Sequence, residues 1–182
     1  MVVFEKPGEQ NTEKTIELAI ESARKNGIKH IVAASYRGFV ADNIAKYADE
    51  FNIVIVAQVD GHMPVNPMEE EHLKVLKEKG LQVLFTTHVL SGAERGISKK
   101  FGGVYPVEII ANSLRMLGQG TKVCVEISTM ALDSRYIPQN EQIVAIAGSG
   151  RGADTAIVMT PAHAAQIFDT KIDEIICKPK LS

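Results

Sequence analysis

The first group of residues that could bind a ligand is Ser35-Tyr36-Arg37-Gly38-Phe39, which follows an apolar run and precedes an expected helix. A serine hydroxyl, a guanidinium and the free N–H groups of a helix start are the components of a phosphate-binding site. A capped turn with an exposed arginine would explain the same residues. We favour the anion site, because ligands of open parallel sheets bind at the carboxyl ends of strands.

The second group is the glycine-rich segment Gly148-Ser149-Gly150-Arg151, which continues to Asp154. A dinucleotide-binding fingerprint is excluded, because the glycine spacing differs and the next residues are β-branched where that motif needs a helix. A glycine loop between two strands can still fold main-chain donors around an anion. The alternative is a hairpin loop whose glycines only permit positive φ.

Two histidines follow central strands and are candidates for work in a cleft. His62 and His88 could donate hydrogen bonds or act as general acid and base. No cluster with the spacing of metal ligands occurs in the chain, so no metal site is predicted.

The segment 88–103 is a long, glycine-containing connection that we predict to be a functional loop. It holds Ser91, Glu94 and Arg95 close to His88. A hydrolase that uses Ser91 and His88 is the weakest interpretation, since no Gly-x-Ser-x-Gly elbow presents the serine.

Short apolar runs alternate with amphipathic segments, as in a parallel sheet covered on both faces. Valine and isoleucine number 17 and 19 against 10 leucines, which favours buried strands. We expect strands over residues 1–4, 30–34, 53–59, 82–86, 123–130, 142–147, 156–160 and 174–177. Helices are expected from Thr12 to Gly27, from Gly38 to Ala48, from an Asn66 cap with Pro67 in the first turn, and from Pro106 to Gly118.

The composition limits the classes of partner that the protein could bind and indicates its cellular location. The net charge of −2 over 182 residues, with ten aromatic residues and no tryptophan, argues against nucleic acid. No apolar stretch approaches the ~20 residues needed to span a bilayer, so no membrane contact and a cytoplasmic location are expected. Cys124 and Cys177 lie in apolar runs and are predicted to be buried, inert thiols. The partner should be a small molecule.

The turn 34–38 entering a helix and the loop 147–155 between two strands resemble the C-terminal α/β domain of pyruvate kinase. The resemblance extends over almost the whole chain, through residues 6–8, 11–13, 88–95, 102–104, 122–127, 151–155, 161–163 and 174–177. It implies one domain over residues 1–182, a three-layer α/β/α sandwich with a mostly parallel central sheet.

The resemblance also implies a function. Stand-alone members of this group are associated with bound FMN, and pyruvate kinase activity is not expected, because 182 residues leave no room for the barrel domain that carries it. Tyr36 replaces the glycine of the pyruvate kinase turn and Ala33 replaces the preceding threonine. A sugar bisphosphate site is therefore not carried over, and the Tyr36 ring could flank a flavin.

We therefore expect FMN, or a similar phosphorylated ligand, at the carboxyl ends of the strands. Its phosphate would lie at residues 35–39, with donors from residues 148–152, and its ring would lie towards His62, His88 and residues 91–95. The chain would be an FMN-dependent oxidoreductase with an external reductant or, alternatively, a non-catalytic regulatory module that senses a phosphorylated metabolite. A homodimer through an exposed apolar helix face is a further expectation.

Overall fold

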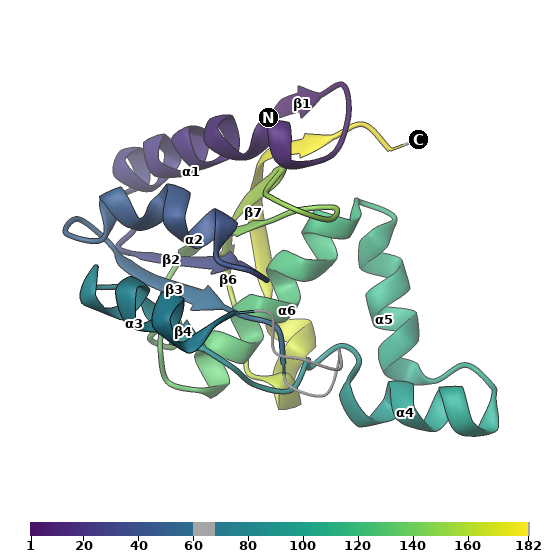
Figure 1. Cartoon of the computed structure of the whole chain (residues 1–182). Coiled ribbons are helices and arrows are strands. Elements are labelled where there is room, and N and C mark those ends of the chain that lie inside the picture. Colours follow the sequence, from purple (N-terminus) through teal and green to yellow (C-terminus); the bar gives the residue numbers. More distant parts are fainter. Residues whose placement is uncertain (60–67, 182) are drawn as a thin grey trace.

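A computed structural model describes residues 1–59 and 68–181 of the chain. Its described strands form one seven-stranded sheet in the order β1-β7-β6-β5-β2-β3-β4, in which β6 alone runs antiparallel to its neighbours (Figure 1). The carboxyl ends of β2 to β5 therefore meet at one edge. The strands are β1 (Val2–Phe4), β2 (His30–Ala34), β3 (Asn52–Val56), β4 (Gln82–Leu84), β5 (Ile143–Ala147), β6 (Thr155–Thr160) and β7 (Lys171–Pro179).

Helices cover both faces of the sheet, so the predicted three-layer α/β/α arrangement is confirmed. α1, α2 and α3 lie on one face and α6 on the other (Figure 1). α4 extends away from the sheet, and α5 leads from α4 back to α6 and packs on it. The helices are α1 (Thr12–Asn26), α2 (Phe39–Ile44), α3 (Glu70–Glu78), α4 (Gly92–Phe101), α5 (Pro106–Arg115) and α6 (Gln119–Asp133). Short 3-10 turns are η1 (Glu9–Asn11), η2 (Ala45–Tyr47) and η3 (Ala164–Asp169).

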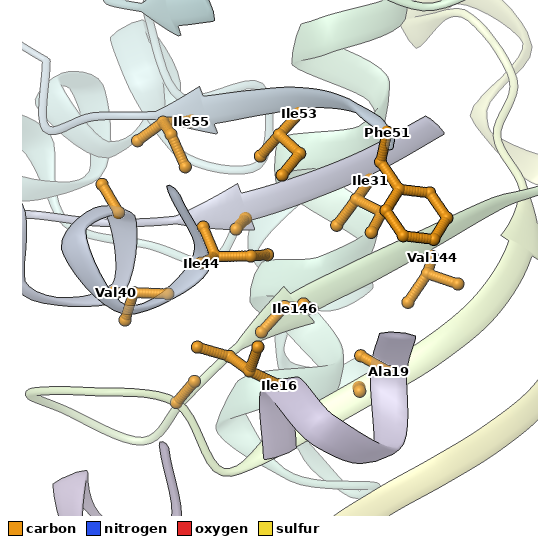
Figure 2. Close-up of a cluster of buried hydrophobic side chains, with 14 of the residues drawn as sticks. Ile16, Ala19, Ile31, Val40, Ile44, Phe51, Ile53, Ile55, Val144 and Ile146 are labelled. Carbon is orange, nitrogen blue, oxygen red and sulfur yellow. The ribbon is translucent and has the colours of Figure 1, made fainter. Parts of the chain in front are cut away.

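The period of two along each strand divides the core into two layers. In β2, Ile31 points to the α1–α2 face and Val32 to the α6 face, and β5 alternates in the same way. Figure 2 shows the first layer, where Ile16 of α1 and Ile44 of α2 meet Ile146 of β5. Since both faces are buried, the central strands consist almost entirely of apolar residues, which made them recognisable in the sequence.

The predicted strand 123–130 is wrong, because these residues belong to α6. Val123, Val125 and Ile127 alternate as in a strand, but Cys124, Met130 and their neighbours are buried as well. A helix that is buried nearly all round has no polar face to reveal a period of 3.6 residues, so β-branched side chains suggested the wrong element.

The prediction that residues 88–103 form a loop without regular structure is also wrong, since α4 occupies Gly92–Phe101. Gly92 and Gly96 weaken the helical signal, and α4 buries none of its residues. Other differences are shifts of element ends: α2 ends at Ile44 and is followed by the 3-10 turn η2, β3 ends at Val56 and not at residue 59, and β7 starts at Lys171 and not at residue 174. The predicted cap Asn66 and Pro67 lie outside the described residues, and α3 is described from Glu70.

Gly120 is a close-packing position in α6 and gives a stability prediction. A Cβ there would lie 2.1 Å from Thr155 Oγ1, and Thr155 cannot turn aside freely because its hydroxyl donates to Asp154 Oδ1 at 2.8 Å. Gly120→Ala should therefore lower the free energy of unfolding by about 1–3 kcal/mol.

Gly96→Ala in α4 is the matched control, because a Cβ at that position meets nothing within 4 Å. It should raise the free energy of unfolding by about 0.5–1 kcal/mol, since alanine restricts the unfolded chain and favours the helix. Urea denaturation of both variants checks the pair. Equal midpoints for the two variants would contradict the packing seen at Thr155.

Both cysteines are buried and free, as predicted. Burial raises the pKa of the Cys177 thiol to about 11 and that of the Cys124 thiol well above its usual value. Both thiols are therefore held in the unreactive protonated form at neutral pH.

Candidate functional site

A cavity of about 310 Å³ opens at the carboxyl ends of β2 and β3, on the α6 face of the sheet. Its floor is apolar and comes from strands and helix alike, whereas its rim carries charged and polar side chains. The floor consists of Ala34, Val56, Ala57, Val123, Ile127 and Met130, and the rim of Tyr36, Gln58, His88, Ser91, Arg95, Arg115 and Gln119. The buried polar residues Ser35, Lys122 and Glu126 complete the wall.

A buried ion pair lies in the wall of this cavity. Lys122 Nζ is 2.5 Å from Glu126 Oε2, one turn along α6, and their side chains are only 6% and 4% exposed. The other carboxylate oxygen, Glu126 Oε1, accepts a hydrogen bond from the Leu90 N–H at 3.0 Å. Burial lowers the pKa of the Lys122 ammonium, although Glu126 opposes the shift, and the positive charges of Arg115 and Arg95 lower it further.

The cationic side chains come from three successive helices. Arg95 is on α4, Arg115 on α5 and Lys122 on α6, and all three line the cavity. Arg115 is held in place, because its Nε donates to Gln119 Oε1 at 2.8 Å and its Nη1 to Asn112 Oδ1 at 3.0 Å. Among the described residues that line the cavity, Glu126 is the one carboxylate, so the site carries excess positive charge.

The amino end of α6 adds to this positive field. Gly118 precedes the helix, no side chain caps it, and its first turn holds no acidic residue. The first N–H groups of a helix lack internal acceptors and lie at the positive end of the helix dipole. Together with three cations, this arrangement is suited to hold an anion.

Gln58 contributes a buried polar group on the opposite side of the cavity, where β3 ends. Its Nε2 is buried and has no hydrogen-bond partner among the residues that the structure describes. An unpaired buried donor is costly, so a ligand that offers an acceptor to it would be favoured. Two other buried oxygens are in the same condition within the described chain, Glu94 Oε2 and Thr129 Oγ1.

Comparison with known proteins identifies the family. The family model for the pyruvate kinase alpha/beta domain matches residues 13–159. The chain belongs to this family. Solved pyruvate kinase structures of Cryptosporidium parvum also match: one in complex with ADP has 17% sequence identity and a TM-score of 0.41, over 88% of this chain and 23% of that one. Another has 16% identity and a TM-score of 0.40, over 89% and 22% of the two chains. The chain thus spans less than a quarter of the length of these enzymes.

In this pyruvate kinase alpha/beta domain, the first predicted segment is divided between two environments. Ser35 and Tyr36 line the cavity, but the Ser35 hydroxyl is engaged as an acceptor for the Ala41 N–H at 3.2 Å. Arg37 is exposed, with its guanidinium 5.5 Å from the centre of the Tyr36 ring. Gly38 lies against the His72 ring, where a Cβ would be 2.0 Å from Cε1.

The second predicted segment lies on the other face of the domain. Arg151 pairs with Glu9 at 2.8 Å and lies 5.1 Å from the centre of the Phe39 ring, which packs against the α1–α2 core. Asp154 is fully buried and accepts hydrogen bonds from the N–H groups of Gly8 and Ser149. The carboxylate therefore organises this loop. None of Gly148, Ser149, Gly150, Arg151 and Asp154 lines the cavity.

Of the predicted histidines and the predicted residues of the segment 88–103, only some lie at the cavity. His88, Ser91 and Arg95 line it, Glu94 lies on the same turn of α4, and His62 is outside the described residues. The polar site residues that the sequence did not reveal are Gln58, Arg115, Gln119, Lys122 and Glu126. A signal for the last two existed: two opposite charges four residues apart in an otherwise apolar segment fit a buried helical pair better than a strand.

No helix in the described part of the chain is long and apolar enough to cross a membrane. Within residues 1–59 and 68–181, no group of three or more histidine, cysteine or acidic side chains is placed to hold a metal ion.

Proposed function

We propose that the protein binds a small phosphorylated molecule with a planar ring in the cavity beside α6, and that FMN is such a ligand. The observation that carries this proposal is the convergence of Arg95, Arg115 and Lys122 on one small cavity at the uncapped amino end of α6. Charge-assisted hydrogen bonds from guanidinium groups are the strongest that a protein offers to a phosphate.

The remaining walls suit the other parts of FMN. Val56, Ile127 and Met130 provide apolar surface for a ring, and Tyr36 adds an aromatic side chain at the rim. The Gln58 amide could donate to a ring carbonyl oxygen and thereby gain a partner that it does not have among the described residues. The cavity volume of about 310 Å³ lies at the lower end of the range for ligands of this size. When bound, FMN supplies electron-transfer chemistry, for which the reductant would come from outside this chain.

This placement of the phosphate differs from the one expected from the sequence. The Ser35 hydroxyl already accepts a hydrogen bond from the Ala41 N–H of α2, and Arg151 already pairs with Glu9. The cations that face the cavity lie instead on α4, α5 and α6. We therefore assign the phosphate to the α4–α6 end and the ring to the β2–β3 end.

Titration of the purified protein with FMN, followed by quenching of flavin fluorescence, tests the proposal. FMN should bind, and riboflavin, which lacks the phosphate, should bind roughly tenfold to hundredfold more weakly, the loss expected for one or two hydrogen bonds to charged groups. Equal affinities for FMN and riboflavin would show that the phosphate is not recognised. If neither compound were quenched, the proposal that the cavity binds a flavin would be wrong.

A regulatory or sensing module is the second candidate, and the construction of α4 favours it. α4 buries none of its residues yet supplies Arg95 to the cavity, and it exposes Ile97 and Phe101. A ligand that binds Arg95 would change the position of α4. The exposed apolar surface formed by Ile97 and Phe101 would move with the helix, and this surface is suited to contact a second copy of the chain.

Anaerobic mixing of the FMN complex with NADH and NADPH separates the two functions. Bleaching of the flavin would support an oxidoreductase. An unchanged spectrum, with a ligand-dependent rise in Tm and a change in the oligomeric state measured by light scattering, would support a sensor.

A further inference from the structure

Lys122 combines burial with access to a cavity, which is unusual for a lysine. Its side chain is only 6% exposed, yet it forms part of the cavity wall together with Val123 and Ile127 of the same helix. A lysine that served only to make an ion pair would not need to face a ligand-sized space. A primary amine in such a position can act as a nucleophile if it can lose its proton.

The groups around Lys122 favour that loss. Glu126 Oε2 lies 2.5 Å from Nζ and can accept the proton, while the Leu90 N–H holds the carboxylate in place through its other oxygen. Arg95 and Arg115 are the positive charges that α4 and α5 present to this lysine, and His88 also lines the cavity. Burial lowers the pKa of the ammonium and these cations lower it further, while the Glu126 charge raises it. The net effect is a lowered pKa, which increases the fraction of free amine at neutral pH.

We propose that Lys122 forms an imine with a phosphorylated aldehyde or ketone whose phosphate is held by Arg95 and Arg115. The proposal rests on the anion-binding end of the proposed function and not on the flavin. It assigns a reaction to the cavity, covalent capture of a carbonyl compound.

Nζ transfers one proton to Glu126 and its lone pair attacks the carbonyl carbon, so that a C–N bond forms and the carbonyl electrons move to oxygen. The carbinolamine oxygen then takes up one proton from Nζ and another from Glu126 and leaves as water. The products are a protonated imine, one water molecule and the Glu126 carboxylate. No oxidant or reductant is needed.

Pyridoxal 5′-phosphate is a suitable probe, because it is an aromatic aldehyde with a phosphate and its imines absorb visible light. The protein is mixed with the probe at a concentration close to its own, the imine is reduced with borohydride, and the modified lysine is located by peptide mass spectrometry. We expect modification of Lys122 at least tenfold above that of the exposed Lys99. Unphosphorylated pyridoxal should modify Lys122 at least tenfold less.

Two variants serve as controls. Lys122→Arg keeps the charge beside Glu126 but has no primary amine, so the folded variant should lose the imine absorbance. Lys99→Gln should leave it unchanged. Circular dichroism confirms that each variant is folded. If Lys122→Arg does not fold, Arg95→Ala provides a second measurement, because it leaves the amine in place. Arg95→Ala should reduce modification of Lys122 at least tenfold.

The outcomes separate this proposal from FMN binding. Modification spread over exposed lysines, with Lys122 untouched, overturns the imine even if FMN binds. Modification of Lys122 without any FMN binding supports the imine and removes the flavin. Modification of Lys122 that does not depend on the phosphate or on Arg95 overturns the assignment of the substrate class.

Discussion

Glu126→Ala is expected to destabilise the protein by about 3–5 kcal/mol, because it leaves the buried Lys122 ammonium without its partner. The two side chains are 6% and 4% exposed, so the lysine would be left in surroundings that hydrate its charge poorly. The variant also removes the acceptor of the Leu90 N–H, which ties α6 to the segment that enters α4. Urea denaturation followed by circular dichroism measures the loss.

The double variant Lys122→Met/Glu126→Leu is the matched control. It replaces both charges with apolar groups of similar size, and such replacements of buried ion pairs are often neutral or stabilising. Its free energy of unfolding should therefore recover most of what Glu126→Ala loses. If the single variant were as stable as the wild type, the pair would have to be open to solvent, and the argument for a low-dielectric lysine would fail.

Arg95→Ala and Arg115→Ala are each expected to weaken FMN binding roughly tenfold to hundredfold, the value of a hydrogen bond to a charged group. Arg37→Ala and Arg151→Ala are the matched controls. Arg37 is exposed over Tyr36 and Arg151 pairs with Glu9 on the opposite face, so either substitution should change the dissociation constant less than about threefold, the scale of an exposed ion pair.

These four variants compare two locations for the phosphate. Fluorescence titration of all four variants at one fixed ionic strength measures their dissociation constants under equal screening of charge. Stronger effects at Arg37 and Arg151 than at Arg95 and Arg115 would return the phosphate to the location expected from the sequence, beside residues 35–39 and 148–152.

The central sheet could be predicted from the sequence because burial on both faces leaves a plain signal. β2 was predicted over its full length, His30–Ala34, and β5 within one residue. α1 was predicted equally well, because Gly27 has the left-handed conformation that ends a helix.

The walls of the cavity could not be predicted in the same way. α6 is buried over so much of its surface that its residues resemble a strand, and α4 is so exposed that no apolar stripe marks it. α6, which gives the cavity six of its lining residues, and α4, which gives it Arg95, thus lie at opposite extremes of burial. At both extremes the helical period of hydrophobicity is weak.

The sequence by itself determined the fold class and the edge of the sheet at which a ligand could bind, because these depend on local patterns of apolar and polar residues. Only the tertiary structure decided which face of that edge holds the cavity. Residues 35–39 and 148–154 both follow strands that end there, yet Phe39 and Arg151 meet on the α1–α2 face while the cavity lies on the α6 face. The sheet separates the two faces, and packing that brings Arg95, Arg115 and Lys122 together from three helices leaves no local mark in the chain.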